Sequence, residues 1–212
     1  MKKILAEYEA EKFLSKYLPV AKSFLCKESA SIVSAAKKLG YPVVLKIISK
    51  QALHKSEIGG VAIVKNQGEL LGAFNSLVSA AKQNKIKFDG ILVQEFVEGK
   101  EVMLGIKNDA TFGHVLAFGI GGKYVEILKD ITFRSCPITK EDAEQMIDEL
   151  KFKQLLFGAR NEKPIDKNIL VNTLVALSQL PEKNKKIEEL DINPFIINEK
   201  QGKVADARIV FN

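Results

Sequence analysis

Two residues in the first third of the chain, Lys46 and His54, carry side chains suited to phosphate chemistry. Lys46 lies in the apolar run 41–48, where a buried ammonium group is costly unless it meets an anion. His54 lies in a polar segment that ends in Gly59 and Gly60, whose backbone can approach phosphate oxygens closely, and histidine can itself carry a phosphoryl group. This pattern indicates ATP binding, although Lys46 could instead point to solvent and His54 could be an ordinary loop residue.

A second group of candidate residues lies near the C-terminus. Alternation along a strand places Glu189, Asp191 and Asn193 on one face, and their oxygen atoms are the ligands that Mg²⁺ prefers. A hairpin would bring Asp206 of the next strand near Asn193, and Arg208 would add a fork of donors for phosphate. The sequence therefore favours a magnesium site here; a solvated acidic strand face is the alternative.

Two turns between expected strands could also contact a ligand. The segment 94–101 ends one strand and begins another, so its backbone amides could read an adenine edge and a carboxylate just beyond could bind ribose hydroxyls. The alternative there is a plain hairpin with surface glutamates. Gly119, Gly121 and Gly122 form a second turn, a weak signal that fits either close backbone approach to a ligand or an ordinary hairpin.

The elements that position these residues are expected to be a mixture of helices and antiparallel strands. Helical spacing of apolar residues predicts helices at 4–17, 30–39, 68–84, 140–150 and 167–180. Short apolar runs between turn residues predict strands at 43–48, 61–64, 91–96, 101–107, 114–118, 124–128, 132–138, 187–192, 195–198 and 203–207. Thr139 and Asp166 are expected to cap the last two helices, and Pro194 to end a strand ladder.

This order of elements predicts an α+β fold rather than a doubly wound sheet. A polar, lysine-rich stretch at 83–89 separates two blocks, which gives an N-terminal lobe at 1–85 and a C-terminal lobe at 86–212.

The composition is that of a globular protein with a substantial core. Of the 212 residues, 46% are hydrophobic and 27% are charged, and no run of about 18 apolar residues or signal peptide is found. The net charge is +6, but the lysines are scattered, which favours an anionic small molecule over nucleic acid. Cys26 and Cys136 are expected to be reduced thiols, which points to the cytoplasm, and His114 is expected to be structural.

Taken together and in this order, the segments resemble an ATP-grasp domain. More specifically, the chain is similar to the β subunit of ADP-forming acyl-CoA synthetases of the acetate–CoA ligase type, a group related to succinyl-CoA synthetase. The resemblance covers nearly the whole chain and rests on the joint match of the blocks at 40–46, 54–61, 94–95, 158–160, 164–166 and 189–194. Departures occur at 17–19, His114 and Asn161, away from the residues expected to bind nucleotide.

The resemblance implies an ATP-grasp fold, in which two α/β lobes grip a nucleotide, and a role for each candidate residue. The implied contacts are Lys46, Gly59 and Gly60 with the nucleotide phosphates, Glu95, Phe96 and Val97 with adenine, Glu101 with ribose, and Asn193 and Asp206 with Mg²⁺. His54 would be a phosphohistidine station near the nucleotide, Asp191 would orient the histidine loop, and Arg208 would steady phosphate.

The implied reaction interconverts acyl-CoA, ADP and phosphate with the acid, ATP and CoA. The resemblance implies a partner α subunit that binds CoA and the acid, in an α2β2 heterotetramer, because this chain carries no dinucleotide-type glycine fingerprint. Met1 favours a separate subunit over a fragment of a fused chain. A catalytically silent regulatory or scaffolding ATP-grasp module is the alternative, and an amide-forming ATP-grasp ligase would leave His54 without a role. The acyl substrate, the choice between ADP and GDP, and the favoured direction stay open.

Overall fold

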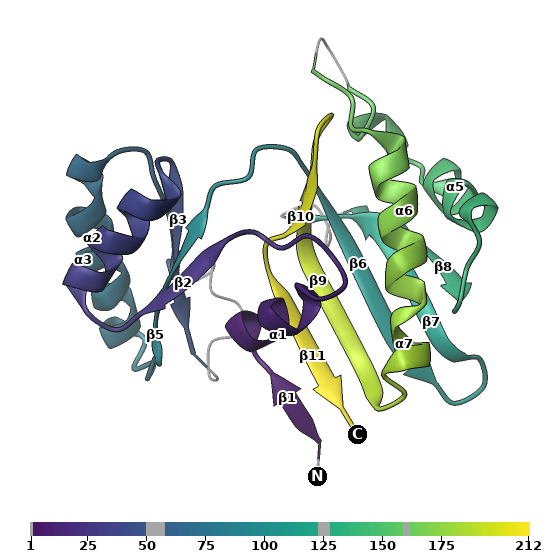
Figure 1. The fold of residues 1–212 in the computed structure, drawn as a ribbon, viewed down its shortest axis with the longest axis horizontal. Helices are drawn as coiled ribbons and strands as arrows, with labels where there is room; N and C mark the ends of the chain where they lie inside the picture. The colour runs from purple at the N-terminus through teal and green to yellow at the C-terminus, as the bar shows by residue number, and fades with distance from the viewer. Residues whose placement is uncertain (1, 50–57, 123–127, 159–161) are drawn as a thin grey trace. The chain divides into compact units, whose positions relative to one another are not determined.

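The computed structural model describes residues 2–49, 58–122, 128–158 and 162–212, and its chain divides into two compact units (Figure 1). Unit 1 comprises Met1–Val20 and Val97–Asn212, and unit 2 comprises Ala21–Phe96. The chain therefore leaves unit 1 after Val20 and returns to it at Val97. Both units combine helices with an antiparallel sheet, so the predicted α+β class is confirmed.

These boundaries differ from the expected lobes 1–85 and 86–212. The N-terminal strand β1 (Lys3–Leu5) pairs with the C-terminal strand β11 (Ala207–Phe211), so the first residues belong to unit 1. Strand β5 (Gly90–Glu95) pairs with two strands of unit 2 and therefore belongs there, beyond the polar stretch 83–89. Strand pairing over long sequence distances decides the boundary, and local composition does not report it.

Unit 2 is a four-stranded antiparallel sheet with two helices. Its strand order is β2-β5-β3-β4, with β2 at Ser23–Cys26, β3 at Val43–Ile48 and β4 at Val61–Val64. Helices α2 (Ser29–Leu39) and α3 (Gln67–Gln83) bury apolar side chains together with alternate residues of the sheet. On β3 these are Val43, Leu45 and Ile47, which leaves Lys46 on the other face.

Unit 1 is built on a seven-stranded antiparallel sheet, in the order β1-β11-β9-β6-β7-β8 with β10 also paired to β9. The remaining strands are β6 (Lys100–Asp109), β7 (Gly113–Ile120), β8 (Ile131–Ser135), β9 (Ile187–Ile197) and β10 (Gly202–Val204). The helices are α1 (Glu7–Leu14), α5 (Lys140–Glu149), α6 (Lys167–Ser178), α7 (Leu180–Lys183) and a 3₁₀ turn at Lys153–Leu155. Side chains of α1, α5 and α6 share one apolar core with the sheet.

The predicted helix caps are confirmed. Thr139 accepts a hydrogen bond from the Asp142 amide, and Asp142 accepts one from the Thr139 amide, which makes a capping box at the start of α5. Asp166 accepts hydrogen bonds from the amides of Asn168 and Ile169 at the start of α6. These contacts use side chains within three residues of the helix start, which is why the local sequence reveals them.

The observed elements differ from the predicted ones in three places. Residues 3–5 form a strand because β11 offers them a partner, and the helix begins only at Glu7. The segment 23–26 is a strand with no clear sequence signal. Strand β9 continues through Pro194 instead of ending there, because Pro194 lies at a bulge in the pairing with β6. The expected strand 124–128 lies almost wholly outside the described residues.

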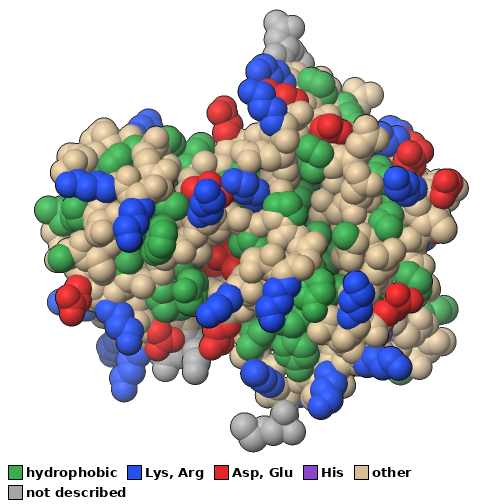
Figure 2. Space-filling view, in the orientation of Figure 1, with side chains coloured by type: hydrophobic (Ala, Val, Ile, Leu, Met, Phe, Trp, Pro, Cys, Tyr) green, Lys and Arg blue, Asp and Glu red, His purple; other side chains and the backbone are tan. Residues whose placement is uncertain are grey.

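Within the part of the chain that the structure describes, no helix combines the length and the apolar character needed to cross a bilayer. Lysine and arginine side chains are scattered over the face shown in Figure 2 and do not gather into one patch there. This distribution agrees with the scattered lysines of the sequence and gives no sign of a nucleic-acid-binding stripe on that face.

Candidate functional site

The oxygen-bearing residues of β9 lie on the sheet face opposite the helix-packed core of unit 1. Leu190 and Ile192 are fully buried in that core, whereas Glu189 and Asp191, which alternate with them along the strand, are exposed. Together with Asn193, Asp206 and Arg208 they form what we call the β9–β11 cluster. The alternation predicted from the sequence is therefore confirmed, because every second side chain of a strand points to the same face.

Strand register brings the members of the β9–β11 cluster together. Arg208 of β11 lies directly opposite Asp191 of β9, and Gly105 of β6 lies opposite Asp191 on the other side. The backbone N–H of Asn193 donates a hydrogen bond of 3.1 Å to the backbone carbonyl of Asp206. The predicted approach of Asp206 to Asn193 is thus present. It occurs where β9 exchanges partner strands, from β11 at Ile192 to β10 at Phe195.

The electrostatics of the cluster are those of crowded carboxylates. Burial, together with the neighbouring charges of Asp206 and Glu189, raises the pKa of Asp191 to about 6, and the positive charge of Arg208 opposes this increase. The Asp191 carboxylate keeps contact with solvent, but the surrounding protein atoms still disfavour its charged form. A bound cation would relieve this repulsion.

Arg208 has an unused hydrogen-bond donor. Its buried Nε atom has no hydrogen-bond partner among the described residues. A buried donor without a partner is rare in proteins and costs free energy. A ligand oxygen that accepted a hydrogen bond from this donor would remove that cost. The nearby carboxamide of Asn193 and carboxylate of Asp206 carry the hard oxygen atoms that Mg²⁺ prefers as ligands. The residues present therefore fit a magnesium–phosphate group.

Lys46 lies on the face of the unit 2 sheet that is opposite the helices. Its neighbours across the strands are Leu92 of β5 and Val61 of β4, and only 7% of its surface is exposed. The alternative that Lys46 points into bulk solvent is therefore excluded. A buried ammonium group is stabilised by polar or anionic groups close to it, so Lys46 is a candidate to contact an anionic ligand.

The two glycines after His54 have different roles. Gly59 has a positive φ of 67°, which is readily accessible only to glycine. The carbonyl of Gly60 accepts a hydrogen bond of 2.9 Å from the Ile47 amide, so Gly60 extends the pairing of β3 with β4 next to Lys46. His54 itself lies outside the described residues.

The segment predicted to hold adenine uses several of its polar groups locally. The Glu95 carboxylate accepts a hydrogen bond of 2.8 Å from the Lys22 amide, and the Glu95 amide donates one of 2.9 Å to the Lys22 carbonyl. The Phe96 amide donates a longer one of 3.4 Å to the Pro42 carbonyl. The Glu95 side chain therefore fastens β5 to the residue before β2, a contact over 73 residues that the sequence did not reveal.

Glu101 and Val97 lie in unit 1. Val97 is buried, whereas Glu101 is exposed on β6, opposite Ile196 of β9. The Gly121 amide donates a hydrogen bond of 2.9 Å to the Glu101 carbonyl, and the Gly122 amide donates one of 3.1 Å to Asn193 Oδ1. The glycine turn therefore touches the residues predicted to bind ribose and Mg²⁺. Its glycines were the only sequence signal for this contact.

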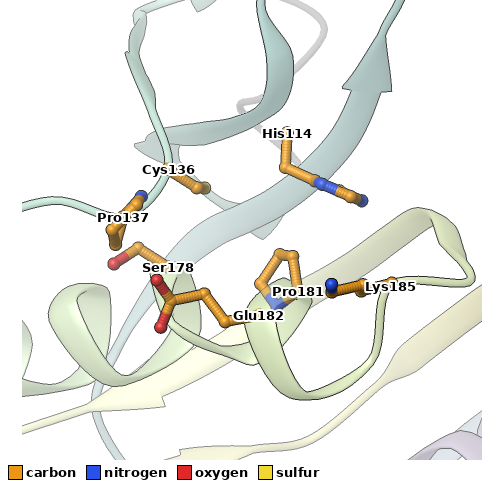
Figure 3. Close-up of a pocket in the computed structure, with 7 residues that line it drawn as sticks. All are labelled: His114, Cys136, Pro137, Ser178, Pro181, Glu182 and Lys185. Carbon is orange, nitrogen blue, oxygen red and sulfur yellow. The ribbon is translucent and has the colours of Figure 1, made fainter.

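A cavity of about 340 Å³ lies elsewhere in unit 1 (Figure 3). It is lined by His114, Cys136, Pro137, Ser178, Pro181, Glu182 and Lys185, none of them a predicted site residue. His114 Nε2 lies 2.8 Å from the Ile187 carbonyl, which supports its expected structural role. Burial raises the pKa of the Cys136 thiol to about 11, so this thiol stays protonated at neutral pH and is a poor nucleophile. Cys136 is therefore not an activated nucleophile in this cavity.

With this geometry established, the chain can be compared with known proteins. The family model described as "ATP-grasp domain" matches residues 1–211. The ADP-forming 4-hydroxybutyrate–CoA ligase of Nitrosopumilus maritimus is 45% identical over 213 residues, which are 97% of this chain and 30% of that protein. The β subunit of the ADP-forming acetate–CoA ligase I of Pyrococcus furiosus is 40% identical over 211 residues, which are 97% of this chain and 91% of that subunit.

Solved structures give the same picture. A chain of the dinucleotide-forming acetyl-coenzyme A synthetase 1 of Ca. Korarchaeum cryptofilum, in complex with coenzyme A, Ca-AMPCP and HgCl⁺, superposes with a TM-score of 0.93 and 39% identity. The match covers 99% of this chain and 94% of that one. A second structure of that synthetase contains coenzyme A and Mg-AMPPCP, with its phosphohistidine segment pointing towards the nucleotide-binding site, and has a TM-score of 0.85, 37% identity and coverage of 99% and 93%.

Proposed function

We propose a function from the premise that this chain belongs to the ATP-grasp family and, within it, to the group of the β subunits of ADP-forming acetate–CoA ligases. In this proposal the chain is the nucleotide-binding β subunit of an ADP-forming acyl-CoA synthetase. It transfers a phosphoryl group between a phosphohistidine and ADP, so that acyl-CoA, ADP and phosphate are interconverted with the acid, ATP and CoA.

The observation that carries this proposal is the match to a complete β subunit. The chain spans only 30% of the Nitrosopumilus maritimus ligase but 91% of the Pyrococcus furiosus β subunit. Because that relative is named a β subunit, a separate α subunit is proposed as the partner, and it would bind CoA and the acid. An α2β2 assembly and a cytoplasmic location belong to the same proposal, and the free thiols of Cys26 and Cys136 favour the latter.

The β9–β11 cluster would provide the metal-binding part of the nucleotide site. Asn193 and Asp206 would hold Mg²⁺, and Arg208 would donate to a phosphate oxygen from the Nε atom that has no partner among the described residues. When bound, Mg²⁺ would neutralise the negative charge of the phosphates. Asp191, held opposite Arg208 by the strand register, would orient the incoming histidine segment.

Unit 2 would provide the positive charge and the adenine contacts. Lys46 is buried, and Gly60 pairs with its neighbour Ile47, so the Lys46 ammonium group is proposed to bind nucleotide phosphates. The Glu95 carboxylate and the amides of Glu95 and Phe96 are engaged within unit 2. Adenine would therefore be held through the remaining backbone groups of residues 95–97, and Glu101 would bind the ribose hydroxyls.

A phosphotransfer experiment tests this function. ATP labelled on its γ-phosphate would be incubated with Mg²⁺ and the chain, with and without its α subunit, for wild type and His54→Ala. The chain contains two histidines, so His114→Ala is the matched control. We expect acid-labile, base-stable label on this chain that is lost in His54→Ala and kept in His114→Ala.

The other outcomes separate the alternatives. ATP binding without label on either chain, even with the α subunit present, would overturn the relay and favour a silent regulatory or scaffolding module. Label on the α subunit alone, unchanged in His54→Ala, would preserve the synthetase function but remove His54 from the phosphoryl path. Absence of nucleotide binding would overturn the proposed function itself.

A further inference from the structure

The turn at Gly121–Gly122 contacts β6 and β9 at once. The Gly121 amide donates to the Glu101 carbonyl at 2.9 Å, and the next amide, that of Gly122, donates to Asn193 Oδ1 at 3.1 Å. A backbone turn between β7 and β8 therefore holds a side-chain oxygen of β9. Since an N–H group cannot donate to the amino end of a carboxamide, this bond also fixes which end of Asn193 faces the turn.

The turn can reach Asn193 only because it lies directly on β6. A Cβ atom at Gly121 would lie 2.5 Å from the carbonyl carbon of Val102 and 2.7 Å from both its Cα and its nitrogen. These are backbone atoms of a central strand, so they cannot move aside as a flexible side chain could. Gly122, with a φ of 65°, leaves room for the Glu101 carboxylate, which a Cβ there would overlap.

The start of the turn is also held in place. Gly119 pairs with Met103 of β6 and Ile131 of β8, and a Cβ at Gly119 would meet the Asp130 carbonyl at 2.5 Å. The Asp130 carboxylate in turn accepts hydrogen bonds from the amides of Lys151 and Phe152, at 3.1 and 2.8 Å. The turn therefore begins from a well-anchored part of the sheet.

We propose that Gly121 and Gly122 are positioning residues for the cation site, because their turn directs the Asn193 carboxamide oxygen. This inference rests on the proposed function, in which Asn193 and Asp206 hold Mg²⁺. An amide oxygen has two lone pairs, so Oδ1 can accept the Gly122 hydrogen bond with one and bind a cation with the other. Groups that hydrogen-bond to a metal ligand and orient it are generally required for full metal affinity.

The test is Gly121→Ala, which pushes the turn away from Val102 and withdraws the Gly122 amide from Asn193. Mn²⁺ binding in the presence of ADP would be measured by electron paramagnetic resonance, and ADP binding in EDTA by calorimetry. We expect the dissociation constant for Mn²⁺ to rise about tenfold or more, and by a larger factor than the dissociation constant for ADP in EDTA, which the contact of the turn with Glu101 also affects. Gly113→Ala is the control for lost stability in unit 1, since its φ of 68° opposes a side chain but no atom lies within 4 Å of a Cβ there.

A double-mutant comparison separates positioning from general damage. If the turn acts through Asn193, then adding Gly121→Ala to Asn193→Ala causes no further loss of Mn²⁺ affinity. A further loss of similar size in the double variant, or an unchanged Mn²⁺ affinity in the single one, would overturn the inference. Wild type that binds no ADP with or without Mn²⁺ would instead overturn the proposed function.

Should Gly121→Ala fail to fold, amide hydrogen exchange decides the question. The Gly122 amide proton is expected to be protected in wild type and to lose that protection in Asn193→Ala, because its acceptor is gone. Equal protection of the Gly122 amide in both proteins would show that Asn193 is not its partner and would contradict the inference.

Discussion

The two sheets each carry candidate nucleotide-binding residues on the face opposite their helices, but the charges differ. In unit 2 that face carries the buried side chain of Lys46, which is paired in register with Leu92 and Val61. In unit 1 the corresponding face gathers the carboxylates of Glu189, Asp191 and Asp206 around a single arginine. The first arrangement attracts a phosphate by itself, whereas the second repels phosphate until a cation is present.

This difference assigns separate tasks to the two units. Unit 2 would contribute to nucleotide affinity with or without a divalent metal, while unit 1 would contribute through the metal. Substitutions in unit 2 should therefore weaken nucleotide binding in both conditions, whereas substitutions in the cluster of unit 1 should act only when the metal is present.

The largest effect is expected for Lys46→Met. Removing the buried ammonium group while keeping the length of the side chain should raise the dissociation constant for ADP by roughly 10- to 100-fold, because a charged hydrogen bond is worth about 1.5–3 kcal/mol. Calorimetry with ADP in EDTA and in Mg²⁺ measures it, and both conditions should show the loss. Lys37→Met, an exposed lysine of α2, is the control. A loss confined to the Mg²⁺ condition would contradict the division.

An intermediate effect is expected for Asp206→Asn. The substitution removes one negative charge from the β9–β11 cluster, so the Mg²⁺ concentration that half-saturates ADP binding should rise roughly tenfold. ADP binding in EDTA should improve or stay equal, because a repulsive charge has gone. Weaker binding in EDTA as well would show that unit 1 contacts the nucleotide without the metal.

A smaller effect concerns pH and Asp191. In the metal-free protein its pKa is raised from 3.8 to about 6, so the folded state binds this proton more tightly than the unfolded chain. The resulting stabilisation is present below about pH 4 and is lost as the pH rises to about 6. Asp191→Asn removes the titration, so the Tm of the variant relative to wild type should increase between these pH values.

Thermal unfolding in EDTA measures this difference, and Asp148→Asn supplies a control of opposite sign. The Lys153 ammonium group lowers the pKa of Asp148, so the wild-type protein gains stability from this group as the pH rises. This gain is complete once the pH exceeds about 4, so the Tm of Asp148→Asn relative to wild type should fall as the pH rises to about 4 and stay level from there to about pH 6. Parallel behaviour of the two variants would refute the assignment of the raised pKa to Asp191.

The smallest effect on binding is expected from a matched pair of helix-cap variants, one in each unit. Asn66 accepts hydrogen bonds from two amides at the start of α3, and Asp166 does the same at the start of α6. Asn66→Ala and Asp166→Ala should each lower the free energy of unfolding by about 1 kcal/mol and leave ADP affinity unchanged. Urea denaturation and calorimetry measure both quantities; altered ADP affinity would show that binding follows stability rather than the named residues.

The sequence predicted the parts of the fold that depend on near neighbours. Strands at 43–48 and 61–64, the caps at Thr139 and Asp166, and the shared face of Asp191 and Asn193 all follow from residues a few positions apart. The nearness of Asp206 to Asn193 was also predicted, because a short connection between antiparallel strands leaves little freedom.

Contacts over long sequence distances were not predicted. The bond between Glu95 and Lys22 spans 73 residues, and the bond between Gly122 and Asn193 spans 71. Neither residue type nor spacing identifies a partner so far away in the sequence. The sequence therefore suggests adenine binding for Glu95 but does not reveal that its carboxylate binds the Lys22 amide. The prediction that Pro194 ends a strand was wrong for a related reason. Only the pairing with β6 and the exchange of partner strands show that β9 tolerates a proline there.

The pairing of β1 with β11 has a consequence for the order in which the protein assembles during synthesis. Unit 2 is an uninterrupted segment, complete once residue 96 has been made, so all its strand contacts can form early. In unit 1, β1 must wait for β11, and Arg208 reaches Asp191 only after β11 has been made. The lysine-bearing sheet is therefore able to fold before the carboxylate cluster, which needs more than 100 further residues of synthesis.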